Sequence, residues 1–206
     1  MGKSFIEKIF DSLSSNKKFP NYQAERRIDI FINHFIERIM SKYLSSETAF
    51  ICPEFPLKKI DNKRSTKLDY LCKTESEIIF VELKTDAISF KESQAKIYLE
   101  INWQNCLKDL QIIIDSQRIE PYKKKYALLK DKIQVVSNYL SPIRVIYLSP
   151  MPSNLNLKFL KIENPKSLGS LNINLTKDER IAWNFLIELD MYVFEMRKLT
   201  PKELNA

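Results

Sequence analysis

The chain has 206 residues, of which 44% are hydrophobic and 29% are charged, and its formal net charge is +7. This length and composition suit one well-packed domain, residues 1–206, and are short for two. The only two glycines, Gly2 and Gly169, exclude a P-loop and a dinucleotide-binding fingerprint, and the single histidine excludes a His-Glu-x-x-His zinc site.

Residues 1–19 are predicted to form an N-terminal arm with a short helix. Within this arm, residues 1–13 are amphipathic and contain no long apolar stretch, so we expect neither a signal peptide nor a membrane span. The cysteines, Cys52, Cys72 and Cys106, are odd in number and widely spaced. This pattern favours reduced thiols in a cytoplasmic protein over a disulfide framework or a zinc cluster.

A long helix is predicted over residues 22–40. Apolar side chains recur there at helical spacing, at Ile28, Phe31, Ile32, Phe35, Ile36 and Ile39. At about 100° per residue, Glu25 falls on the apolar side of this helix, whereas Glu37 points to the opposite side. Glu25 is therefore expected to face the core, where a carboxylate needs a partner.

Residues 67–72 and 77–84 are predicted as two strands of a hairpin joined by a tight connection. If the connection is symmetric, residues whose numbers sum to 151 lie opposite each other, so Asp69 faces Glu82. Their Cβ atoms would then be about 4.5–5.5 Å apart. The period of two residues puts Lys84 on the same face as Glu82.

Another long helix is predicted over residues 90–116, with Gln94 and Tyr98 on one face. A further helix is predicted over residues 122–139, and the β-branched run at residues 143–148 suits a buried parallel strand. These elements complete a core at about residue 150.

Residues 151–206 are predicted as a C-terminal extension. Residues 153–173 read as irregular, with a strand suggested at residues 157–162. Thr176 and Glu179 form a capping-box pattern that opens a final helix, which we expect to continue to about residue 198. The apolar face of this helix would pack on the sheet; a dimer seam is the less favoured alternative.

Asp69, Glu82 and Lys84 form the most informative constellation. Residues 78–81 are apolar on both faces, so this strand is expected to be central, where two opposed carboxylates destabilise the sheet unless something offsets their charge. A divalent cation would do so, because Mg²⁺ takes one or two carboxylates and fills its other positions with water and substrate phosphate. Lys84 would orient or deprotonate the attacking water. The alternative is an ordinary half-exposed strand end.

The spacing of Asp69, Glu82 and Lys84 resembles that of the PD-(D/E)XK nuclease superfamily. The resemblance would span residues 20–150 and implies an α/β, restriction-endonuclease-like core of a helix, three antiparallel strands, a helix and a further strand. It also implies phosphodiester hydrolysis with Mg²⁺ or Mn²⁺. One departure is Leu68, which stands where the family pattern has proline.

The family usually has an acidic residue on its first core helix, and Glu25 is the candidate for this further metal ligand. Its alternative is a solvated first-turn Glu that favours the helix dipole. Gln94 and Tyr98 are similar to an additional motif of the RecB-like and lambda-exonuclease-like branch, which implies contacts with the nucleic acid. An ordinary amphipathic helix explains this pair equally well. The polar-side His34 is interpreted as structural.

Basic residues gather in two places. The loop predicted to lead into Asp69 holds Lys58, Lys59, Lys63, Arg64 and Lys67. Such a loop would attract a phosphate backbone, as would Lys91 and Lys96 on the following helix. The second cluster, residues 123–125 between two tyrosines, is interpreted as solvated surface.

The sequence therefore predicts a Mg²⁺- or Mn²⁺-dependent deoxyribonuclease that binds DNA and no membrane. It would cut phosphodiester bonds, and its possible protein partners are a second copy of the chain in a homodimer or an accessory protein. The alternative is a catalytically inactive nuclease-fold module that binds nucleic acid or another protein, because fold alone does not establish function. A third hypothesis is a structural domain in which the motif arose by chance.

Overall fold

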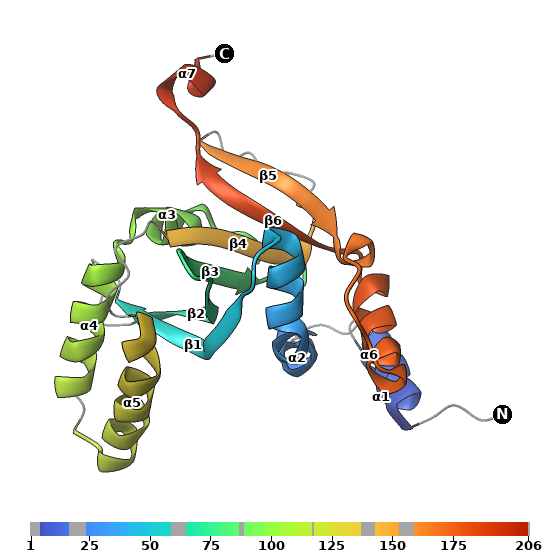
Figure 1. The fold of residues 1–206 in the computed structure, drawn as a ribbon, viewed down its shortest axis with the longest axis horizontal. Coiled ribbons are helices and arrows are strands. Elements are labelled where there is room, and N and C mark those ends of the chain that lie inside the picture. Colours follow the sequence, from blue (N-terminus) through green and yellow to red (C-terminus); the bar gives the residue numbers. More distant parts are fainter. Residues whose placement is uncertain are drawn as a thin grey trace.

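The computed structural model describes residues 5–16, 24–58, 65–86, 89–116, 118–136, 143–152 and 159–205. Its centre is a six-stranded sheet with the order β1-β2-β3-β4-β6-β5 (Figure 1). The strands are β1 (Ala49–Lys58), β2 (Ser65–Lys73), β3 (Ile78–Leu83), β4 (Ile143–Pro150), β5 (Leu160–Ser167) and β6 (Met191–Lys198). β3 and β4 pair in parallel, and the other neighbours pair antiparallel. The fold is mixed α/β with an open, mostly antiparallel sheet.

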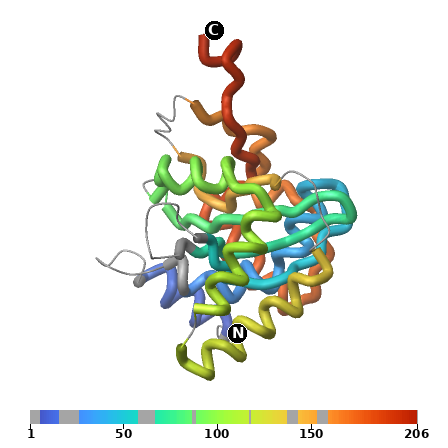
Figure 2. Tube along the Cα trace, turned by 90° about the vertical axis from the view of Figure 1, so that its left-hand side faces the viewer, coloured from blue at the N-terminus to red at the C-terminus, as the bar shows by residue number. Residues whose placement is uncertain are grey.

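Helices cover both faces of this sheet (Figures 1 and 2). The helices on the sheet are α1 (Phe5–Asn16), α2 (Ala24–Leu44), α3 (Glu92–Glu100), α4 (Trp103–Asp115), α5 (Glu120–Ile133) and α6 (Lys177–Glu188), and a short α7 (Pro201–Leu204) follows β6 beyond the end of the sheet. One buried cluster joins α1, α2 and α6 to the sheet, and a second joins α3, α4 and α5 to the opposite face. None of these helices combines the length and apolarity needed to cross a membrane.

Helix α2 packs on the sheet through the apolar residues whose spacing predicted the helix. Ile28, Ile32, Phe35, Ile36 and Ile39 are all 2% exposed or less. The helix runs four residues beyond the predicted end, to Leu44.

The predicted hairpin register is confirmed. Tyr70 pairs with Val81 and Leu71 with Phe80, so that paired residue numbers sum to 151. All six residues of β3 are buried, and the strand lies between β2 and β4. As expected from its apolar sequence, β3 is a central strand covered on both faces.

The single helix predicted over residues 90–116 is wrong, because α3 ends at Glu100 and α4 begins at Trp103. Ile101 and Asn102 are extended between them. The side chain of Asn102 accepts hydrogen bonds from the backbone N–H groups of Gln104 and Asn105. An asparagine that caps a new helix in this way competes with continuation of the preceding one.

Helix α5 is shorter than predicted. It begins at Glu120, with a proline in its first turn, and ends at Ile133 instead of residue 139. A short 3₁₀ turn, Gln134–Val136, follows it, and residues 137–142 lie outside the described part.

The C-terminal extension also differs from the prediction. The capping box of Thr176 and Glu179 is present, but α6 ends at Glu188. Asp190 then takes a left-handed conformation, with φ 53°, which stops the helix, and residues 191–198 form β6. β6 buries side chains on both faces and pairs with β4 and β5, so the extension widens the sheet instead of adding only a helix.

Candidate active site

Glu82 is the centre of a buried polar cluster. It lies near the end of β3 and is 2% exposed. Its Oε1 accepts hydrogen bonds from Lys84 Nζ at 2.5 Å and from Gln94 Nε2 at 2.8 Å, and its Oε2 accepts one from the Tyr98 hydroxyl at 2.7 Å. Burial of a carboxylate is costly unless it is paired and hydrogen-bonded, and these three donors meet that need.

Lys84 reaches Glu82 because the sheet continues past the end of β3. The backbone N–H of Lys84 donates to the Leu148 carbonyl at 2.8 Å, which extends the pairing with β4 by one step. In an extended chain, residues two apart point to the same face, so the side chains of Lys84 and Glu82 meet. Lys84 is itself buried, at 7% exposed.

Asp69 lies beside this cluster on β2. Its Oδ2 accepts a hydrogen bond from the Leu83 backbone N–H at 2.7 Å, just beyond the Tyr70–Val81 ladder pair. The half-buried carboxylate is therefore anchored to the residue between Glu82 and Lys84. The three charged residues of the predicted site come together.

Helix α3 supplies the other two donors. Gln94 and Tyr98 are four residues apart, so they share a helical face, and the Gln94 side chain also donates to the Tyr98 hydroxyl at 2.7 Å. Tyr98 is 1% exposed and packs edge-on against Phe80. Both side chains are thus directed at Glu82.

Two phenols near Glu82 keep their protons at neutral pH. Burial, followed by the charge of Glu82, raises the pKa of Tyr98 well above its usual value. Burial also raises the pKa of Tyr147, and the carboxylates of Glu82 and Asp69 raise it further. Tyr147 was missed in the sequence, because its place beside Glu82 depends on the pairing of β3 with β4.

The cluster offers a cation two carboxylates. Among the described residues there is no group of three or more His, Cys, Asp or Glu side chains that could hold a metal ion. Mg²⁺ needs only one or two carboxylates, since water and substrate phosphate complete its coordination. The oxygen donors of Asp69 and Glu82 therefore fit Mg²⁺ or Mn²⁺, and they do not resemble a zinc site.

The predicted ligand Glu25 falls in the first turn of α2, but its side chain lies outside the described residues. One turn later, Asp29 accepts a short hydrogen bond from the hydroxyl of Tyr70, the residue after Asp69. This contact, which the sequence did not reveal, ties α2 to β2 next to the cluster. Glu37 points elsewhere and accepts from the Phe50 backbone N–H. His34, 58% exposed, pairs with Glu179 of α6.

The predicted basic loop is shorter than expected. β1 runs to Lys58 and β2 begins at Ser65, while Lys59, Lys63 and Arg64 lie outside the described residues, as does the side chain of Lys58. The exposed Lys67 forms an ion pair with Glu54 at 2.6 Å.

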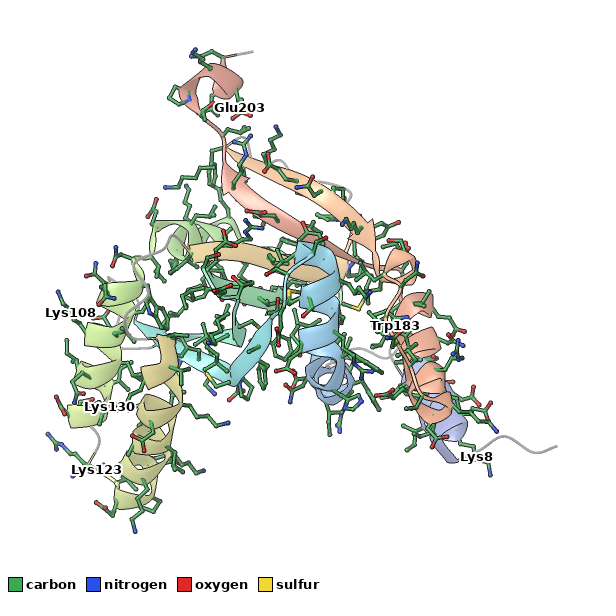
Figure 3. All side chains as sticks on the ribbon, in the orientation of Figure 1. Lys8, Lys108, Lys123, Lys130, Trp183 and Glu203 are labelled. Atoms are coloured by element: carbon green, nitrogen blue, oxygen red, sulfur yellow. The ribbon has the colours of Figure 1, made fainter. Side chains whose placement is uncertain are left out.

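The helices carry the other lysines of interest. Lys91 is the N-cap residue of α3, and Lys96 on the same helix forms an ion pair with Glu92 at 2.8 Å. Residues 123–125 are exposed on α5, and Lys123 lies on the outer part of the α4–α5 pair, away from α3 (Figure 3).

Comparisons of the chain with models of protein families, with curated proteins and with solved structures found no match. The polar cluster therefore has to be interpreted from its own chemistry.

Proposed function

We propose that this protein is a metal-dependent nuclease that hydrolyses DNA phosphodiester bonds with Mg²⁺ or Mn²⁺. The observation that carries the proposal is the buried pair of Glu82 and Lys84 beside Asp69. A buried ion pair is weak as a stabilising device, because apolar residues of similar volume do as well or better. A chain that places charges in a central strand is therefore more readily explained by a functional need.

The arrangement of elements supports the proposal. From α2 through β1, β2 and β3 to the helices α3–α5 and then β4, the order is the one implied by the resemblance to PD-(D/E)XK nucleases. β1 to β3 are antiparallel, and β4 is parallel to β3. The described part of the crossing between β3 and β4 contains three α-helices, α3 to α5, where the simplest form of that core has one. We accordingly propose a restriction-endonuclease-like core.

In this proposal each side chain has a distinct task. Asp69 and Glu82 would hold the cation, with Glu25 as the third candidate. The cation would supply a lowered pKa for the attacking water and neutralisation of charge on the phosphate. Lys84 would exchange its contact with Glu82 for one with the attacking water, which it orients or deprotonates.

For Gln94 and Tyr98 we propose a role other than the predicted contact with the nucleic acid. Both hydrogen-bond to Glu82, so we propose that they fix the orientation of the Glu82 carboxylate. Such outer contacts hold metal ligands in place, and their loss typically reduces metal affinity or activity by about 10- to 100-fold. The proposed basic contacts with the substrate are Lys63 and Arg64, which lie between β1 and β2 in the sequence, and Lys67 near the start of β2.

The test is cleavage of linear, circular and single-stranded DNA by purified protein with Mg²⁺ or Mn²⁺. We expect Lys84→Ala to lower the cleavage rate by about 10²- to 10⁴-fold, the usual contribution of a general acid or base. Lys42→Ala, which removes an exposed lysine of α2, is the matched control. Full metal-dependent cleavage by Lys84→Ala would contradict the proposed role.

The second candidate is a nuclease-fold module that binds nucleic acid without cutting it. The observation that favours it is that three donors already bind the two oxygens of the Glu82 carboxylate. Calorimetric titration with Mn²⁺ separates the two candidates when combined with the cleavage assay. DNA binding by wild-type protein that neither binds Mn²⁺ nor cuts DNA would favour the module.

A further inference from the structure

Tyr147 is fixed beside the polar cluster by its strand and by its neighbours. It lies on β4 directly opposite Glu82 in the parallel register. Its ring stacks on Phe90 at 5.1 Å and on Phe194 at 5.9 Å between ring centroids. The residue is 1% exposed, so packing determines where its hydroxyl points.

The side chain of Tyr147 lies on the same face of the sheet as that of its register partner Glu82. Within the described part of the chain, the bonds to Glu82 come from Lys84, Gln94 and Tyr98, and the Tyr147 hydroxyl makes none. In that part, Asn33 Oδ1 is the only side-chain polar atom that is both sealed from solvent and without a partner. The Tyr147 hydroxyl is not among the atoms sealed in this way, although the residue as a whole is 1% exposed.

The contrast with Tyr98 indicates a different use for the second phenol. The Tyr98 hydroxyl is occupied by Glu82 and Gln94, whereas the Tyr147 hydroxyl is a neutral donor that the protein leaves available. A neutral donor next to two carboxylates suits an anionic ligand, because it adds a hydrogen bond without adding negative charge. Asp69 and Glu82, when ionised, can only accept hydrogen bonds.

We propose that the Tyr147 hydroxyl donates a hydrogen bond to a phosphate oxygen of a nucleic acid bound at Asp69 and Glu82. This inference rests on the proposed function, and it assigns a substrate contact to a residue outside the sequence motif. Tyr147 is then a substrate-binding residue, and Lys84 and Tyr147 approach the phosphodiester from neighbouring strands.

The variant Tyr147→Phe removes only the oxygen atom and keeps the ring between Phe90 and Phe194. Because the hydroxyl has no partner among the described residues, we expect the melting temperature to stay within about 2–4 °C of wild type. Hydrogen bonds to charged groups are among the stronger ones, so we expect a loss of about 10- to 100-fold in DNA affinity or in kcat/KM.

Two assays measure this loss. Fluorescence anisotropy of a labelled oligonucleotide, without divalent cation and with Ca²⁺, reports binding, and Mg²⁺-dependent cleavage gives kcat and KM. A lower DNA affinity of Tyr147→Phe would show that the hydroxyl contacts the phosphate in the bound state. A lower kcat alone would show that it does so in the transition state, and either result supports the inference. Tyr43→Phe is the control, because it removes a buried hydroxyl that contacts Glu163 and lies outside the cluster.

The outcomes distinguish this inference from the function on which it rests. If Tyr147→Phe binds and cuts DNA as well as the wild-type protein does, while Lys84→Ala loses cleavage, the role of Tyr147 alone is overturned. Failure of the wild-type protein to bind or cut any DNA would overturn both proposals. A Tyr147→Phe protein whose melting temperature falls well below that of Tyr43→Phe would instead assign the hydroxyl a structural role.

Discussion

The Tyr98 hydroxyl donates a hydrogen bond to Glu82 Oε2 at 2.7 Å, between side chains that are 1% and 2% exposed. Together with the bond from Gln94, this contact fastens α3 to the end of β3 and orients the carboxylate on which the proposed chemistry depends. Because the bond joins a buried phenol to a buried carboxylate, the contribution of Tyr98 is measurable as stability as well as activity.

We expect Tyr98→Phe to lower the free energy of unfolding by about 1.5–3 kcal/mol, the usual worth of a hydrogen bond to a charged group. Urea denaturation at pH 7 measures the change. Tyr126→Phe, on the half-buried side of α5, controls for removal of a tyrosine hydroxyl elsewhere. Equal stability of the two variants would show that the Tyr98–Glu82 bond contributes nothing.

Lys84→Met should be more damaging than Tyr98→Phe. It leaves the buried Glu82 without its cationic partner, and loss of one member of a buried ion pair typically costs about 3–5 kcal/mol. The double variant Lys84→Met with Glu82→Gln removes the orphaned charge, so we expect it to be more stable than Lys84→Met alone. If the two variants unfold at the same urea concentration, the ion pair is not the source of the loss.

Asp69→Asn should separate stability from metal binding. The asparagine carbonyl oxygen can still accept from the Leu83 N–H, while repulsion between carboxylates 69 and 82 is removed. We expect an equal or higher melting temperature in EDTA and at least about tenfold weaker Mn²⁺ binding in calorimetry. Asp131→Asn, on the exposed side of α5, controls for loss of a negative charge. Unchanged Mn²⁺ affinity would remove Asp69 from the cation site.

The hairpin and its charged residues could be predicted because their geometry is local. A tight connection fixes the register of adjacent antiparallel strands, so the positions of Asp69 and Glu82 follow from counting along the chain. Lys84 follows from the period of two residues, and the Gln94–Tyr98 pair from the helical period. What these residues contact, including the bond from Tyr98 to Glu82, needed the packing of α3 on the sheet.

The errors arose where tertiary context decided between local alternatives. Residues 191–198 carry apolar side chains that satisfy a helical spacing, and only the left-handed Asp190 and pairing with β4 turn them into a strand. Asn102 likewise has no strong signal as a helix boundary until its side chain caps α4. Tyr147 was missed for the same reason, because its parallel pairing with Glu82 spans the whole crossover between β3 and β4.

A pH titration can test the link between α2 and α6. Hydrogen bonds from Arg38, then from the Thr176 backbone and His34, hold the pKa of Glu179 well below its usual range. The Arg38 contact is 2.7 Å long. Because the pKa is lower in the folded state, the unfolded chain binds the proton more readily in acid.

The stabilisation from ionised Glu179 is therefore present above the unfolded pKa of about 4.3 and is lost as the pH falls through the folded value. Glu179→Gln can still accept the capping hydrogen bond from the Thr176 backbone, so it removes the charge and the acceptor for Arg38 and His34 while it keeps the cap. We expect a lower melting temperature than wild type at pH 7 and a difference that shrinks steadily below about pH 4. Glu188→Gln, exposed at the end of α6, should show no such trend. A Glu179→Gln difference that stays constant from neutral to acidic pH would assign the effect to packing instead of charge.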